Sequence, residues 1–191
     1  MDSHPTRPMP HDPPARDRGT GGWPELDALT HHIIQHHHRY VREAAPAITG
    51  RLGALAAGRI SPHEGLAEIW RAFAALCEEL LEHMMKEEHV LFPYIDELAA
   101  AGRAGLRPPA SPFGTLVHPV RVMESEHQLA LELVDRLRSL TGEYVPPRDA
   151  DPALESCYAD LARFDADLRQ HIELENQVLF PRAIEIENAF A

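Results

Sequence analysis

The sequence predicts an all-α protein folded as an up-down-up-down four-helix bundle. Four long stretches of the chain carry apolar residues at the three- and four-residue spacing of amphipathic helices. Segments rich in proline and glycine separate these stretches, as connections between neighbouring helices require. No stretch shows the alternating apolar and polar pattern, or the enrichment in β-branched residues, that is typical of strands.

The composition is that of a globular protein, with an acidic balance. Apolar residues make up 44% of the 191 residues and charged residues 25%, and the length suits one domain. The formal net charge of −12 argues against nucleic acid or an anionic membrane as a partner. The chain shows neither a signal-peptide pattern nor a membrane-spanning apolar run, which predicts a cytoplasmic protein. Cys77 and Cys157, without CxxC spacing, are expected to be free thiols within helices.

The beginning of the chain differs from the remainder. Residues 1–22 are rich in proline, glycine and charged residues without apolar periodicity, which predicts a disordered tail before a folded domain over 23–191. The first helix is expected to begin near Glu25. Pro46 should bend or interrupt it, leaving a second helical piece over 47–58.

The second predicted helix begins with a strong start signal in the segment 61–64, where a serine cap is followed by a proline and then a glutamate. It runs to about Ala101, with a kink expected at Pro93. A loop over 102–118 leads to the third helix, from about Pro119 to Leu140.

The fourth predicted helix follows a proline-containing loop over 142–150. Asp151 and Pro152 give it a cap and a first-turn proline. It runs to about Ala189, and Pro181 within it matches the proline of the second helix.

One sequence pattern, H-x3-E-x2-V-L-F-P, occurs twice. It begins at His83 in the second predicted helix and at His171 in the fourth. In each copy the glutamate, Glu87 or Glu175, lies four residues after the histidine and therefore on the same helix face. An imidazole and a carboxylate one turn apart provide half of a metal site, so the repeat predicts a binuclear site.

Each copy is preceded by a helix that carries a further histidine. His38 precedes His83 by nearly the same number of residues as His127 precedes His171. In an antiparallel hairpin of long helices, this equal spacing places each lone histidine at about the depth of the neighbouring motif. Six side chains are therefore predicted to meet at one level of the core: His38, His83, Glu87, His127, His171 and Glu175.

Other residues compete for the site, because the chain contains 13 histidines. Helical phase alone does not choose between His36, His37 and His38, whereas the spacing favours His38. Glu88 lies about 140° around the helix from the motif histidine where Glu87 lies about 40° away, so Glu88 should face solvent or support the site from outside. The remaining histidines of the predicted helices and loops are expected at the surface, at the rim or far from the site: His31, His32, His63, His89 and, as a weak candidate, His118.

The predicted donor set suits two first-row metal ions. Four imidazoles and two carboxylates, with no thiolate, fit iron or manganese better than calcium or a structural zinc. Each carboxylate can bridge the two ions, and open positions remain for dioxygen, peroxide, nitric oxide or water. The alternative is a polar core held by hydrogen bonds alone, which does not account for the matched repeat.

The nearest rival arrangement is a ferritin-like di-iron site. That site requires Glu-x-x-His on two helices, and the chain has this motif only from Glu124 to His127. The repeated H-x3-E favours a hemerythrin-like arrangement instead.

Segments from all four predicted helices resemble the hemerythrin-like domain of the RIC family, the YtfE/ScdA di-iron proteins that repair iron–sulfur centres. The resemblance covers about residues 25–188 and lies in His32–Pro46, Glu78–Pro93, Val122–His127 and Leu174–Ala183. It implies a cytoplasmic four-helix bundle with a non-haem, oxo-bridged di-iron centre held by the same six residues. It also implies that Glu79 and Glu126 occupy acidic positions near the centre and could line an access path.

The family resemblance implies repair of iron–sulfur clusters after oxidative or nitrosative stress, by iron delivery or by nitric oxide chemistry, with iron–sulfur proteins as partners. Full-length members carry an N-terminal Cys-Cys domain where this sequence has its proline-rich tail, and many have a histidine in place of Arg59. Two alternatives remain: a reversible binder or sensor of dioxygen or nitric oxide, and a nitric oxide or peroxide reductase. The sequence assigns no catalytic residue.

Overall fold

The computed structural model describes residues 25–57 and 65–190, which are helical apart from turns and connections. The α-helices are α1 (Leu26–Ile33), α2 (Arg39–Ala57), α3 (Leu66–Lys86), α4 (Phe92–Ala104), α5 (Val117–Leu140), α6 (Pro152–Leu174) and α7 (Phe180–Ala189). Three π-helical turns join some of them: η1 (Ile34–His38), η2 (Glu87–Leu91) and η3 (Glu175–Leu179). The predicted tail, the start signal at 61–64, His63 and Arg59 lie outside the described residues.

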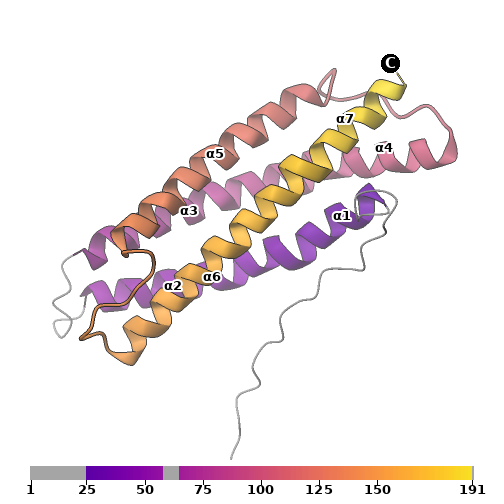
Figure 1. Ribbon diagram of the computed structural model, residues 1–191. Coiled ribbons are helices and arrows are strands. Elements are labelled where there is room, and N and C mark those ends of the chain that lie inside the picture. Colours follow the sequence, from indigo (N-terminus) through magenta and orange to yellow (C-terminus); the bar gives the residue numbers. More distant parts are fainter. Residues whose placement is uncertain (1–24, 58–64, 191) are drawn as a thin grey trace, which may run out of the picture.

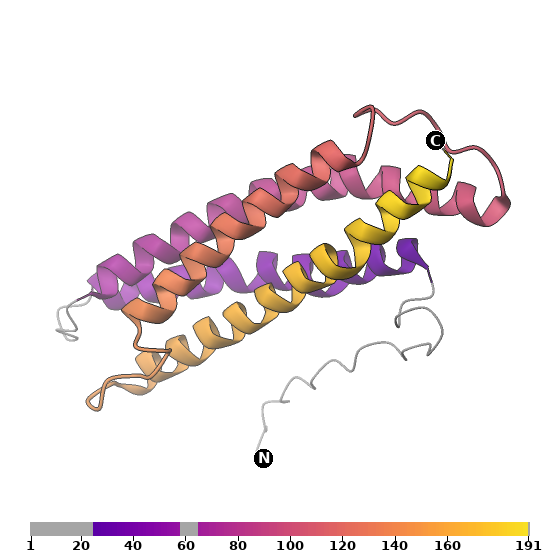
Figure 2. The same ribbon diagram turned by 45° about the horizontal axis from the view of Figure 1, so that its top comes forward.

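These elements form four long helices arranged as a bundle (Figures 1 and 2). The first consists of α1, η1 and α2, the second of α3, η2 and α4, the third of α5, and the fourth of α6, η3 and α7. Each long helix packs on the ones before and after it, and the first also packs on the fourth. The prediction of an up-down-up-down bundle is confirmed, and the described residues contain no strand. No helix in this part of the chain has the length and apolar character to cross a bilayer.

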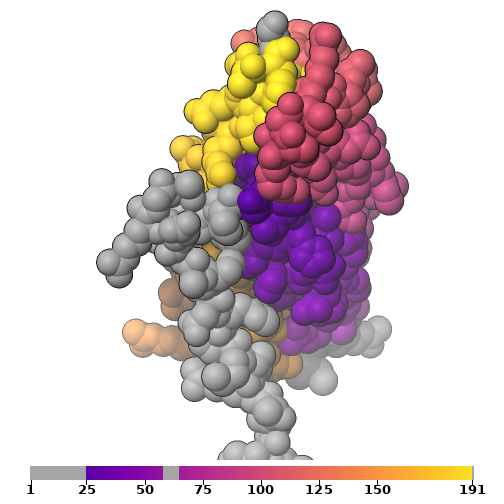
Figure 3. Space-filling view, turned by 90° about the vertical axis from the view of Figure 1, so that its right-hand side faces the viewer, coloured from indigo at the N-terminus to yellow at the C-terminus, as the bar shows by residue number. Residues whose placement is uncertain are grey.

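The hydrophobic core is divided into two clusters along the bundle. One lies among α2, α3, α5 and α6 and includes Leu52, Phe73 and Leu161. The other joins α1, α4 and α7 to the start of α5 and includes Leu29 and Ile95. Figure 3 shows α1, α4 and α7 side by side at the end of the bundle that contains this second cluster. Along each long helix the predicted ligands lie near the point where residues of one cluster give way to residues of the other.

Cys77 and Cys157 are both buried and free, as the sequence predicts. Each lies in the first hydrophobic cluster. Burial raises the pKa of Cys77 to about 12 and that of Cys157 to about 11. The two thiols therefore stay protonated and act as apolar packing groups.

One of the two effects predicted for Pro46, an interruption of its helix, is not found. Pro46 does not interrupt its helix, because α2 continues through it, with buried Ala45 and Ile48 packing on either side. Tertiary packing therefore outweighs the loss of one helical hydrogen bond. Pro93 and Pro181 follow η2 and η3 closely. A proline cannot donate the next bond of an α-helical ladder, and a π turn precedes each of them.

Replacing Asp151 by alanine is expected to destabilise the protein by about 1 kcal/mol. The Asp151 carboxylate accepts a hydrogen bond from the backbone N–H of Leu154 at 2.8 Å and so caps α6. Thermal unfolding followed by circular dichroism should show a midpoint lower by roughly 2–4 °C. Asp149→Ala, which removes an exposed carboxylate in the preceding loop, is the control. Equal midpoints for the two variants would contradict the capping role.

Candidate metal centre

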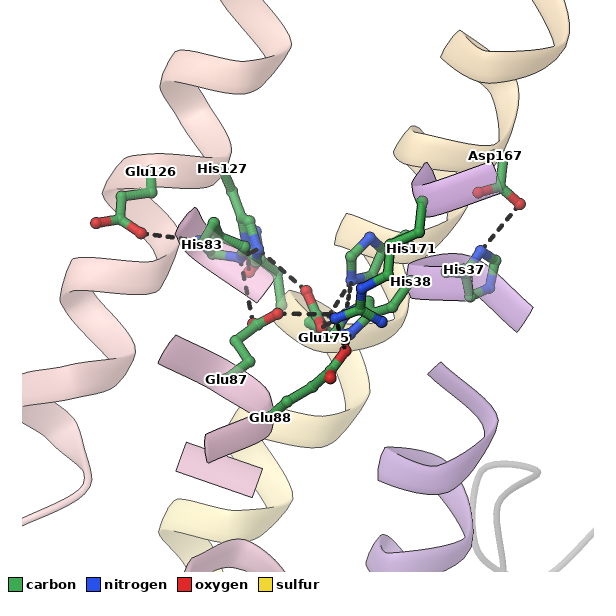
Figure 4. A network of polar contacts seen from close by, with 12 residues as sticks. His37, His38, His83, Glu87, Glu88, Glu126, His127, Asp167, His171 and Glu175 are labelled. Atoms are coloured by element: carbon green, nitrogen blue, oxygen red, sulfur yellow. Dashed lines mark hydrogen bonds and ion pairs between the residues drawn. The ribbon is translucent and has the colours of Figure 1, made fainter. Parts of the chain in front are cut away.

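The structure brings all six predicted ligands together between the two hydrophobic clusters (Figure 4). Three of them lie at π turns: His38 ends η1, Glu87 begins η2 and Glu175 begins η3. The other three come from α3, α5 and α6. All six side chains are buried, the most exposed at 4%. Since π turns in α-helices occur frequently at functional sites, their coincidence with three of the six side chains marks this level of the bundle.

The six side chains form two groups of four that share both carboxylates. His38 and His171 form one group with Glu87 and Glu175, and His83 and His127 form the other with the same two glutamates. Within each group, one donor atom per residue can be chosen so that all four atoms lie within 4.8 Å of one another. This is the arrangement in which two carboxylates bridge a pair of cations.

Each group contains two imidazole nitrogens that face each other. The Nε2 atoms of His38 and His171 lie 3.1 Å apart, and those of His83 and His127 lie 2.9 Å apart. Two nitrogens bound at right angles to one ion, each by a bond of about 2.1 Å, would be separated by about 3 Å. The spacing of both histidine pairs therefore fits a shared cation.

The carboxylates approach the same nitrogens but are incompletely paired. Glu175 contacts His171 Nε2 at 2.9 Å through Oε1 and His127 Nε2 at 3.0 Å through Oε2, and Glu87 Oε1 lies 3.2 Å from His83 Nε2. By hydrogen-bond geometry, both Glu87 oxygens and Glu175 Oε2 are nevertheless buried without a partner among the described residues. Buried carboxylate oxygens are rarely left so, and a pair of cations would satisfy them. The donor set thus fits two metal ions.

Charge compensation within the cluster is visible in the pKa values. Burial lowers the pKa of His38, but Glu87 and Glu88 oppose it and raise the net value to about 9. Burial likewise lowers the pKa of His83, and Glu87 raises it to about 9. Burial raises the pKa of Glu175, while the neighbouring histidines hold it well below the usual range. Because imidazole must be deprotonated to coordinate a metal, binding of a metal ion by this cluster would release protons.

Two of the imidazoles donate their outer N–H to a carboxylate. His38 Nδ1 bonds to Glu88 Oε1 at 2.6 Å, and His83 Nδ1 bonds to Glu126 Oε2 at 2.8 Å. Each carboxylate is in turn held by a more exposed cation, Arg42 for the first and Lys86 for the second. Metal-bound histidines almost always make such a bond, which fixes the tautomer and the ring orientation. Glu88 therefore supports the cluster from outside, one of the two roles expected from its helical phase.

A third imidazole is supported by a residue that the sequence reasoning missed. His127 Nδ1 lies 2.8 Å from Asn176 Oδ1. Asn176 directly follows Glu175, as Glu88 directly follows Glu87, so the repeat itself contained the signal. The position after each motif glutamate supports the lone histidine of the same half of the chain.

The phenylalanine of each V-L-F-P sequence packs on a predicted ligand. The Phe92 ring stacks on His38 with centroids 5.8 Å apart, and the Phe180 ring stacks on His127 at 6.1 Å. Both phenylalanines are almost completely buried. They limit the positions of the two lone imidazoles and exclude water from one side of the cluster.

The remaining histidines take different places. His37 is buried beside the cluster, where it bonds to Asp167 Oδ1 at 3.0 Å, while His36 stacks on His32 at 4.1 Å. His38 is thus the member of this run that reaches the centre. The histidines exposed at the surface are His31, His89 and His118, of which His118 lies in α5 and not in a loop. Glu79 is exposed on α3, one turn before His83.

Comparison with known proteins agrees with this architecture. Residues 29–183 match the family model described as the hemerythrin HHE cation binding domain. The chain is also 35% identical over 164 residues to the iron-sulfur cluster repair protein YtfE of Salmonella newport (strain SL254) and of Salmonella agona (strain SL483). Both alignments cover 84% of this chain and 67% of the relative. The resemblance inferred from the sequence is thereby confirmed, and the chain belongs to the hemerythrin HHE cation-binding family.

Proposed function

We propose that the chain is a non-haem di-iron protein whose six buried residues hold two iron ions. His38 and His171 would bind one ion, His83 and His127 the other, and Glu87 and Glu175 would bridge them. The observation that carries this proposal is the pair of four-residue groups sharing both carboxylates. Mixed imidazole and carboxylate donors suit iron, and two imidazoles with two carboxylates per ion leave coordination positions open.

The biological role that fits best is repair of iron–sulfur clusters damaged by oxidative or nitrosative stress, in the cytoplasm. The YtfE relatives carry that role in their name, and the similarity extends over most of this chain. In this role the ion pair supplies iron, and iron–sulfur proteins are the partners that receive it. The open positions also allow dioxygen or nitric oxide to bind.

The chain's own residues hold the ions and link them to the surface. Glu88 and Glu126 fix the rings of His38 and His83 and are themselves only partly buried. Arg42 and Lys86 hold these two carboxylates from the solvent side. Each ion pair is therefore one hydrogen bond away from a metal-binding histidine. A docking partner that displaces Arg42 or Lys86 would alter the carboxylate that orients this histidine. Glu79, exposed on α3, makes no such link to another described residue.

Anaerobic reconstitution with ferrous iron tests the proposal. Metal analysis should give two irons per chain, and incubation with an apo iron–sulfur protein and added sulfide should restore the visible absorption of its cluster. His171→Ala should reduce the iron content, whereas His118→Ala, which removes an exposed histidine of α5, should not. Fewer than two irons in the wild-type protein, or unchanged iron content in His171→Ala, would refute the site.

A second candidate is a reversible binder of dioxygen or nitric oxide. The stacked, buried Phe92 and Phe180 favour it, because an apolar lining protects a bound diatomic ligand. A stable oxygenated form that releases dioxygen under vacuum would support this candidate. Iron transfer to the apo protein without such a form would support repair, and repeated turnover of nitric oxide or peroxide with a released product would identify a reductase.

A further inference from the structure

The two halves of the chain support the centre in the same way except at one position. Glu88 and Asn176, each directly after a motif glutamate, bond to the lone histidine of their own half. Glu126, directly before His127, bonds to the motif histidine of the first half, His83. The repeat places His37, directly before His38, in the position that corresponds to Glu126.

His37 does not support the second motif histidine as Glu126 supports the first. Its ring lies parallel to that of His171, with centroids 5.5 Å apart and 8° between the planes. Its Nδ1 atom bonds to Asp167 instead (Figure 4). His171 Nδ1 is consequently buried without a hydrogen-bond partner among the described residues. Of the four imidazoles in the cluster, His171 alone shows this defect in the described structure.

This defect makes the two halves of the metal centre unequal. Both imidazoles of the group with His83 and His127 are supported through Nδ1, whereas the other group has one supported ring and one unsupported ring. Removing such an outer hydrogen bond typically lowers metal affinity about 10–100-fold, because the bond orients the ring and makes it a better donor. The bridging carboxylates serve both ions and so do not compensate for the difference.

We propose that the ion held by His38 and His171 is the exchangeable ion of the pair and that the ion held by His83 and His127 is the retained one. This inference rests on the proposed di-iron centre and adds the order in which the two ions leave it. The centre would release one ion to an acceptor more readily than the other, so that the buried carboxylates keep one cation while the first is transferred. His37 is then a positioning residue whose identity sets the lability of the first ion.

The test follows iron loss from the fully loaded protein to a ferrous chelator under anaerobic conditions. We expect two phases of equal amplitude, one iron each, with rates that differ about 10–100-fold. His37→Glu, which gives the first half the carboxylate found at Glu126, should slow the fast phase toward the slow one. His37→Gln accepts the same hydrogen bond without adding charge beside Asp167 and should act in the same direction.

The reciprocal variant is Glu126→Ala, which should leave the fast phase in place and accelerate the slow phase about 10–100-fold. Glu124→Ala removes an exposed carboxylate of α5 and should change neither phase. A single phase for both irons in the wild-type protein, or Glu126→Ala that accelerates neither iron, would overturn the inference while leaving the di-iron site intact. Failure to load two irons at the start would refute the proposed function instead, so the two failures are distinguishable.

Discussion

Replacing Glu175 by glutamine is expected to reduce the iron content of the reconstituted protein from two ions per chain to fewer than one. Glu175 belongs to both four-residue groups, and its two oxygens contact histidines of different groups. Glutamine has nearly the same shape but offers one oxygen and no charge. It therefore cannot bridge two cations, and both groups lose a ligand at once. Metal analysis after anaerobic reconstitution and desalting measures the effect.

The matched control is Glu173→Gln, which removes the same charge from an exposed position two residues earlier on α6. It should retain both irons. Circular dichroism of the metal-free Glu175→Gln variant should show an intact bundle, because the substitution removes a buried charge without changing side-chain volume. Two irons per chain in the Glu175→Gln protein would show that the carboxylate does not bridge.

The fold and the six clustered residues could be predicted because both depend on spacing along helices. The repeated H-x3-E fixes one face of two helices, and equal hairpin lengths fix the depth of His38 and His127. The four-helix arrangement required only apolar periodicity and the positions of proline and glycine. Neither inference requires the rotamer of any side chain, because each follows from residue positions along a helix.

The supporting residues could not be predicted in the same way. Helical phase did not distinguish His38 from His37, and only the spacing to His83 favoured His38. Both residues lie in η1, a π turn with no proline near it, and a π turn changes which face each following residue presents. The roles of Glu126 and Asn176 depend on contacts between different long helices, which helical phase does not specify. The uninterrupted path of α2 through Pro46 depends on packing of the whole helix. In each case tertiary contacts decide among local alternatives that are close in free energy.

Removing the metal from the loaded protein is expected to lower its thermal midpoint by more than any single surface substitution. The six polar side chains interrupt the core between two hydrophobic clusters, and the Glu87 carboxylate there has no hydrogen-bond partner among the described residues. An ion that binds only the folded state stabilises it by about 4 kcal/mol when its free concentration is about a thousand times Kd. For a chain of this size, the midpoint of the loaded protein should therefore lie roughly 8–16 °C above that of the metal-free protein. Scanning calorimetry with and without ferrous iron, under anaerobic conditions, measures the shift.

The dependence of the midpoint on iron concentration separates specific binding from a general effect of salt. Each tenfold increase in free iron above Kd should add about 1.4 kcal/mol for each ion that exchanges with solvent. Glu175→Gln should show little or no increase over the same range, since it lacks the shared carboxylate of both groups. Equal increases of the midpoint in the variant and the wild-type protein would mean that the stabilising ions bind outside the buried cluster, on the acidic surface. An increase of the midpoint in the wild-type protein alone would mean that metal bound at the buried polar layer stabilises the fold. The two proteins differ only at Glu175, which belongs to that layer.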